Sequence, residues 1–264
     1  MSSGQPAARP KRYELVAGRT LGLLHLREGA PGAPRLVCLP HSGGTPHVFD
    51  ALAAALPADW SVRALDPPGH VRTRGAPLRS VDAIALACLE GLPAGLLEGA
   101  VLVGLSLGGY VALALARALA RRAAPPPALV VLATRPPSER KGERPSGLGD
   151  DELFRWLVAL GGVPGPQPEW RQIFDVFKDA LRADLEAYAT YDPGPDPTPP
   201  CPALFVGGHD DVHSPPELFA SWRRDAPGAR VELVPGGHFA VRDRAAEVAA
   251  LVAPFVRQHW PAGR

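Results

Sequence analysis

The sequence is poor in cysteine and almost balanced in charge. Its 264 residues include only three cysteines, Cys38, Cys88 and Cys201, with no CxxC pair. An odd number at wide spacing argues against a disulfide framework or a zinc site and favours thiols in a reducing compartment. The 28 Lys and Arg nearly cancel the 27 Asp and Glu, whereas a chain that mainly binds nucleic acid usually has a clear basic excess. We therefore do not expect nucleic acid as a partner.

The sequence also lacks a long hydrophobic run. No apolar stretch reaches the roughly 20 residues of a membrane-spanning helix, because Pro, Arg or Glu interrupts each one. The beginning, MSSGQPAARPKRYELV, has no apolar region of a signal peptide. We expect residues 1–11 to form a flexible tail and the protein to be cytoplasmic, without membrane contact.

Strand and helix signals alternate along most of the chain, which predicts an α/β fold with a mostly parallel central sheet covered by helices on both faces. The length suits a single domain, which we place at residues 12–264. The strands are expected within 35–40, 61–70, 99–105, 128–137, 202–208 and 229–237. The helices are expected within 46–60, 80–92 (with Ser80 as N-cap), 107–122, 215–225 and 245–258.

The alternation is interrupted between residues 137 and 200, where no strand signal occurs. A charged loop leads into two helical stretches, 151–162 and 170–191, and the segment ends in the proline-rich DPGPDPTPPCP, which no helix tolerates. A helical insertion with Pro- and Gly-rich ends is typical of a lid over a site. We expect a lid insertion here, within the single domain.

The stretch VLVGLSLGGY, at 101–110, contains a candidate nucleophile, Ser106. It lies where a strand meets a helix, and a nucleophile there needs a sharp, strained turn. Side chains at Gly104 and Gly108 would collide in such a turn, which explains the pattern GxSxG. The pattern alone is weak, but its position between a strand and a helix makes it a specific indication of the nucleophile of an α/β-hydrolase.

A serine nucleophile needs a base, and the base needs an acid that orients it. In α/β-hydrolases the chain order is Ser, acid, His. The last histidine after a strand is His238, in VPGGHFAV, and we expect it to be the base. The acid follows the strand at 202–208: Asp211 is favoured by its spacing from the glycines and the next helix, and Asp210 remains the alternative.

The oxyanion of a tetrahedral intermediate needs two backbone N–H donors. One is expected from Leu107, the residue after the nucleophile, and the other from the loop LPHSGGT, where we choose Ser42. His41 precedes the nucleophile in this loop, and we do not expect it to transfer protons. The cluster HDDVH at 209–213 contains metal-ligand residue types, but its loop setting does not suit a metal site, so neither metal nor cofactor is expected.

Taken together, these motifs resemble the type II thioesterases, the free-standing editing enzymes of polyketide and nonribosomal peptide assembly lines. The resemblance covers most of residues 35–258, in the order typical of that family. The segments that carry it are LVCLPHSGGTPHVF, ALDPPGHVRTRG, VGLSLGGYVALALARAL, LVALGGVP, ALRADLEAYATY, CPALFVGGHDDV, FASW and VPGGHFAV.

The resemblance implies an α/β-hydrolase fold and hydrolysis of acyl groups from the phosphopantetheine arm of an acyl carrier protein or peptidyl carrier protein, without a cofactor. It implies Ser106 as nucleophile, Asp211 as acid and His238 as base, with oxyanion amides from Ser42 and Leu107. The sequence departs from the family at Leu105, where the family usually has His. It also departs at His70 and Val71, where the family has Arg and Gly.

Carrier proteins are commonly acidic, so basic residues are candidates for docking. These are Arg117, Arg121 and Arg122 at a helix end, and Arg140, Lys141 and Arg144 in the lid loop. Two other functions compete with carrier editing. One is a hydrolase or acyltransferase of the same fold that acts on small esters or acyl-CoA, and the other is a non-catalytic binding protein.

Overall fold

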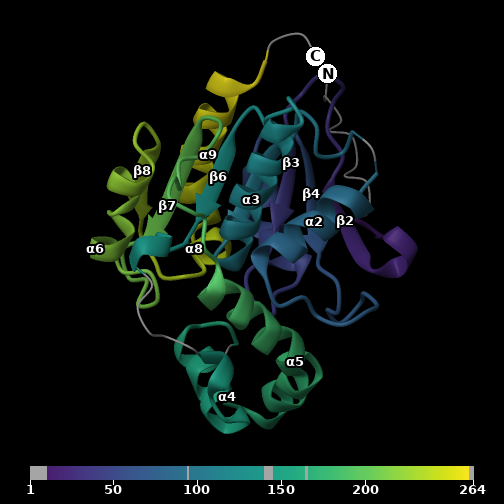
Figure 1. Ribbon diagram of the computed structural model, residues 1–264, viewed down its shortest axis with the longest axis vertical. Helices are drawn as coiled ribbons and strands as arrows, with labels where there is room; N and C mark the ends of the chain where they lie inside the picture. Colours follow the sequence, from purple (N-terminus) through teal and green to yellow (C-terminus); the bar gives the residue numbers. More distant parts are fainter. Residues whose placement is uncertain (1–10, 94, 140–144, 164–165, 262–264) are drawn as a thin grey trace, which may run out of the picture.

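A computed structural model describes residues 11–93, 95–139, 145–163 and 166–261. The expected N-terminal tail therefore lies outside the described residues up to residue 10. The described residues form an eight-stranded sheet in the order β1-β2-β4-β3-β5-β6-β7-β8 (Figure 1). The strands are β1 Arg12–Val16, β2 Leu21–Arg27, β3 Arg35–Leu39, β4 Ser61–Asp66, β5 Val101–Leu105, β6 Leu129–Leu132, β7 Ala203–Gly208 and β8 Arg230–Val234.

The strands from β3 to β8 pair in parallel, as predicted. Their short apolar runs are buried because helices cover both faces of the sheet. The sequence pattern did not predict β1 and β2, which form an antiparallel edge beside β4. The two strands are joined across Ala17–Arg19, where Gly18 has a φ of 63°, a left-handed conformation that glycine adopts without strain.

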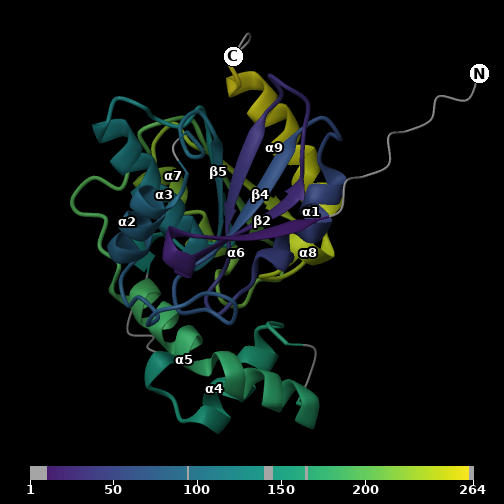
Figure 2. The ribbon, with the colours of Figure 1, turned by 90° about the vertical axis from the view of Figure 1, so that its right-hand side faces the viewer.

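Helices cover the two faces of the sheet in two layers. Figure 2 shows α2 (Val81–Gly91) and α3 (Leu107–Arg121) on one side and α1 (Asp50–Ala55) and α9 (Ala245–His259) on the other. A separate cluster of buried apolar side chains fills each interface between helices and sheet. Ser80 caps α2 as predicted, since its side chain accepts the N–H of Ala83 at 3.2 Å.

The remaining short helices differ in detail from the expectation. The helix predicted at 215–225 is two helices, α6 (Pro216–Phe219) and α7 (Trp222–Asp225), and α8 (Ala240–Asp243) precedes α9. The short 3₁₀ helices lie at Ala17–Arg19, Pro46–Phe49, Pro137–Glu139 and Pro145–Gly147. Among the described residues, no helix combines the length and the apolar character needed to span a bilayer.

The inserted segment contains α4 (Asp150–Ala159) and α5 (Pro168–Thr190), which lie together beyond one end of the sheet (Figures 1 and 2). Apolar side chains from these helices and their connection form a small core of their own, which includes Leu153, Phe174 and Leu181. The segment therefore has enough internal packing to hold its shape at the edge of the main body.

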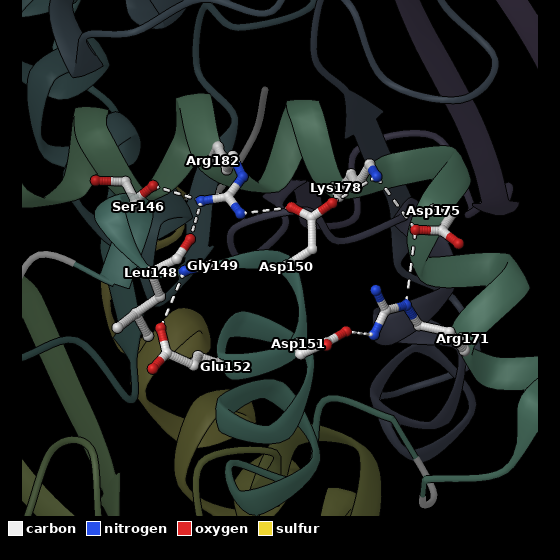
Figure 3. A network of polar contacts seen from close by, with 10 residues as sticks. All are labelled: Ser146, Leu148, Gly149, Asp150, Asp151, Glu152, Arg171, Asp175, Lys178 and Arg182. Carbon is white, nitrogen blue, oxygen red and sulfur yellow. Dashed lines mark hydrogen bonds and ion pairs between the residues drawn. The ribbon is translucent and has the colours of Figure 1, made fainter.

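Ion pairs fasten the start of α4 to the middle of α5 (Figure 3). Arg182 donates to the carbonyls of Ser146 and Leu148 at 2.6 and 2.7 Å and to Asp150 at 2.7 Å. Lys178 contacts the other oxygen of Asp150 at 2.7 Å. The hydrogen bonds from Lys178 and Arg182 lower the pKa of Asp150 to about 2, so this link stays charged at any ordinary pH.

Candidate active site

The expected site residues all follow the carboxyl ends of parallel strands, where open α/β sheets place their ligand sites. Ser106 directly follows β5, Asp211 comes three residues after β7, and His238 comes four residues after β8. The loop with Ser42 follows β3, which pairs with β5. Because neighbouring parallel strands end at the same edge, the fold brings these residues together from distant parts of the chain.

Ser106 has a backbone conformation that non-glycine residues rarely adopt, with φ 54° and ψ −117°. Hydrogen bonds on both sides hold it there. Its N–H donates to the carbonyl of Leu132 at 2.9 Å, and its carbonyl accepts from the N–H of Gly109 and the hydroxyl of Thr134, each at 2.9 Å. Such strain persists only where the surroundings enforce it, and it is typical of a nucleophile between a strand and a helix.

Glycines make this turn possible. A Cβ atom at Gly104 would lie 2.1 Å from the carbonyl oxygen of Gly108, and one at Gly108 would lie 2.1 Å from the carbonyl oxygen of Leu39. The predicted collisions at these two positions are confirmed. Gly109 has the same constraint, which the sequence analysis did not single out: a Cβ there would meet the Thr134 hydroxyl at 2.1 Å.

His238 and Asp211 form a buried pair. The Nδ1 of His238 lies 2.9 Å from one carboxylate oxygen of Asp211, and both residues are at most 4 % exposed. The other oxygen accepts the backbone N–H groups of His213 and Ser214, each at 2.9 Å. Burial alone would raise the pKa of Asp211, but the hydrogen bond from His238 and these amides hold it below its usual value. Asp210, the alternative acid, is exposed.

A small cavity of about 20 Å³ joins Ser106 and His238. On one side it is covered by side chains of α4 and α5 of the inserted segment, among them Leu157, Leu181 and Tyr188. The nucleophile candidate and the base candidate therefore face one enclosed, largely apolar space, and in this conformation the space is about the size of one water molecule.

The loop after β3 also borders this cavity through His41 and Ser42. The N–H of Gly43 is not available as an oxyanion donor, because it donates to Asp184 on α5 at 2.7 Å. For the amides of Ser42 and Leu107 the structure records no protein acceptor among the residues it describes.

Two neutral histidines flank the pair of His238 and Asp211. Burial, together with the charge of His238, lowers the pKa of both His41 and His213 to about 3. The ring of His213 packs edge-on against His238, with centroids 5.2 Å apart, and His41 packs edge-on against Phe239 at 4.9 Å. Both rings are therefore uncharged at neutral pH.

A larger cavity of about 610 Å³ lies next to the site and shares His41 with it. One wall comes from α5, with Trp170, Ile173 and Phe177, and the other from the loop after β3 and from Phe239. Its lining is mainly apolar, which suits a hydrophobic group of substantial size.

The cluster HDDVH does not form a metal site in the part of the chain that the structure describes. Its two histidines diverge, since His209 is exposed and His213 packs against His238. No group of three or more His, Cys, Asp or Glu among the described residues is arranged to hold a metal ion.

Comparisons with known proteins identify the family. The thioesterase domain family matches residues 34–255. The thioesterase PikA5 of Streptomyces venezuelae is 30% identical over 220 residues, which cover 82% of this chain and 78% of that protein.

Solved structures agree with this match. The type II thioesterase BorB from the borrelidin biosynthetic cluster superimposes with a TM-score of 0.79 at 30% identity, covering 89% of this chain and 97% of BorB. RedJ, the thioesterase of the prodiginine pathway in Streptomyces coelicolor, gives 0.74 at 30% identity, covering 84% of this chain and 86% of RedJ. The resemblance noted in the sequence is confirmed: the chain belongs to the thioesterase family, with the α/β-hydrolase fold, and it is a type II thioesterase.

Proposed function

We propose that this thioesterase removes acyl groups from the phosphopantetheine arm of an acyl or peptidyl carrier protein, with Ser106 as nucleophile, His238 as base and Asp211 as the acid that orients it. The observation that carries the proposal is the buried pair of His238 and Asp211 at the same cavity as the strained Ser106. The match to type II thioesterases supplies the substrate class.

The reaction proceeds by two acyl transfers. His238 takes the proton of the Ser106 hydroxyl through Nε2, and the oxygen attacks the thioester carbonyl. The carbon–sulfur bond breaks, His238 returns the proton to the pantetheine thiolate, and the acyl group stays on Ser106 as an ester. Water then attacks this ester with His238 again as base, which releases the carboxylic acid and the free serine. Asp211 stabilises the imidazolium form in both halves.

The negative charge of each tetrahedral intermediate falls on the former carbonyl oxygen. The amides of Ser42 and Leu107 are the proposed donors, and the N-terminus of α3 adds its favourable dipole. Removing one such donor from an enzyme of this type typically costs about 10²- to 10³-fold in kcat.

We further propose that residues 12–264 act as one domain, in which the insertion at 137–200 is a lid and the 610 Å³ cavity receives the acyl group. The support is that the lid supplies one apolar wall of this cavity and also covers Ser106. Because the cavity beside Ser106 is so small, substrate entry requires movement of lid side chains.

The docking candidates at the end of α3 lie far from Ser106. Since α3 starts at Leu107 and rises about 1.5 Å per residue, Arg121 and Arg122 are about 20 Å from Ser106. Arg117 is engaged with the carbonyls of Pro193 and Asp196. The lid-loop candidates Arg140, Lys141 and Arg144 lie outside the described residues.

The substrate class is tested by kinetics on matched acyl donors. The same acyl group is presented on a carrier protein, on coenzyme A and as a simple ester, and kcat/KM is measured for each. The proposal expects the carrier-bound form to be preferred by at least about tenfold. Preference for the ester or for coenzyme A would favour the small-substrate hydrolase or acyltransferase instead.

A further inference from the structure

A buried carboxylate on the lid helix α5 contacts the loop that supplies the Ser42 amide. Asp184 is 2 % exposed, and its Oδ2 accepts the backbone N–H of Gly43 at 2.7 Å. The Nε2 of His70, in the turn after β4, lies 3.0 Å from the same oxygen. Three segments that are distant in sequence therefore meet at one carboxylate oxygen.

Asp184 and His70 form a buried pair of opposite charge type. A buried carboxylate is costly unless it is paired and hydrogen-bonded. Burial alone would lower the pKa of His70, but the adjacent Asp184 raises it above its usual value, which favours the imidazolium form. Thr73 fixes the turn, because its hydroxyl accepts the N–H of His70 at 2.9 Å and lies 2.6 Å from the carbonyl of Pro67.

The other side of the contact is a glycine of the loop in the left-handed conformation. Gly43 has a φ of +65°, and a Cβ there would lie 3.0 Å from Leu181, one turn before Asp184 on α5. Its N–H belongs to the peptide unit that joins Ser42 to Gly43. A carboxylate that holds this N–H fixes the plane of that peptide and restrains the backbone of Ser42, whose own N–H belongs to the preceding peptide.

We propose that Asp184 and His70 are positioning residues for the oxyanion hole, which lock the Ser42–Gly43 peptide and make the hole depend on the seating of the lid helix. The inference rests on the proposed thioester hydrolysis through Ser106 and Ser42. Neither residue touches the reacting atoms. Their effect passes through the amide of Ser42, which acts mainly when charge develops on the substrate oxygen.

Removal of the contacts of Asp184 with Gly43 and His70 should lower kcat and leave KM within about twofold. The reason is that the stabilisation is lost in the transition state only. Asp184→Ala and His70→Phe should each reduce kcat by about 10- to 100-fold, somewhat less than loss of the donor itself. Asp184→Asn keeps an oxygen for Gly43, and His70→Gln keeps a donor for Asp184, so both should retain most of the activity.

The matched control is Glu186→Ala, which removes a partly exposed carboxylate from the same helix and breaks its ion pair with Arg79. It should leave kcat unchanged. All rates are divided by the concentration of active sites titrated with a serine-directed fluorophosphonate, so that a loss of folded protein does not count as a loss of kcat. Hydrogen exchange of the peptide that covers residues 41–45 should quicken in Asp184→Ala and stay unchanged in Glu186→Ala.

The inference is overturned if Asp184→Ala and His70→Phe keep wild-type kcat per titrated site, or if KM rises while kcat holds. Should these two variants fail to fold, Asp184→Asn decides, because a neutral amide oxygen accepts the Gly43 N–H more weakly than a carboxylate. Faster exchange at 41–45 with most of kcat retained supports the inference, and exchange and kcat both equal to the wild type overturn it. A failure of the proposed function looks different, because the wild type itself would then hydrolyse no thioester.

Discussion

Replacement of Asp211 by Asn tests the acid through the proton it places on His238. One oxygen of Asp211 accepts two backbone N–H groups, and the other faces Nδ1 of His238. An asparagine has one acceptor oxygen. Because the backbone N–H groups of His213 and Ser214 donate to this oxygen, the NH₂ group faces Nδ1 of His238. His238 must then carry its proton on Nε2, where it can no longer accept the proton of Ser106.

The size of the effect follows from the same contacts. To regain the active tautomer, the asparagine has to turn its NH₂ group towards the two amides, which leaves two buried N–H groups unsatisfied at about 1 to 3 kcal/mol each. The total of about 2 to 6 kcal/mol corresponds to a loss of about 30- to 10⁴-fold in kcat, and the upper end agrees with the cost of this change in serine proteases.

The assay is thioester hydrolysis at saturating substrate, with thermal unfolding as the check on the fold. Asp210→Asn is the matched control, because Asp210 is the neighbouring residue and is exposed. It should leave kcat within about twofold of the wild type. The reasoning is refuted if Asp211→Asn stays within tenfold of the wild type, or if Asp210→Asn loses as much.

Three further predictions concern the turn and its neighbours. Gly108→Ala places a Cβ 2.1 Å from a backbone oxygen and should lower the free energy of unfolding by about 3 kcal/mol, whereas Gly147→Ala, with nothing within 4 Å, should be neutral in the same denaturant titration. Thr134→Val removes the hydroxyl bonded to the Ser106 carbonyl and should cost about 1 kcal/mol, measured in the same way; an unchanged stability would contradict it. The pKa of His41 is lowered to about 3 in the folded state. Between this value and about pH 6.5 the unfolded chain therefore binds a proton at His41 that the folded chain does not bind, so the free energy of unfolding falls as the pH drops below about 6.5. His41→Phe should reduce that loss by up to about 3 kcal/mol at pH 4, and an identical pH profile would count against this origin.

The sequence was most informative where a local pattern is enough. The strands β3 to β8 are short apolar runs that end in turns, and GxSxG demands a particular backbone geometry around Ser106. The edge strands β1 and β2 were missed: LGLLHLR in β2 is an apolar run without clear alternation, and such a run does not reveal an antiparallel partner.

Other features depend on contacts that no local pattern encodes. Asp210 and Asp211 both follow β7, and only the fold shows that Asp211 faces His238 while Asp210 faces solvent. The contact of Asp184 with Gly43 joins residues 141 positions apart, so no pattern in the sequence predicts it. The roles assigned to Ser106, Asp211, His238 and the two amides remain predictions.

The most direct test of the account is intact-mass spectrometry of an acyl-loaded carrier protein incubated with the wild-type enzyme and with Ser106→Ala. The account predicts that the acyl mass disappears with the wild type and persists with the variant, while the variant keeps the wild-type unfolding temperature. Equal loss of the acyl group in both samples would contradict Ser106 as nucleophile, and persistence in both would contradict hydrolysis of carrier-bound thioesters.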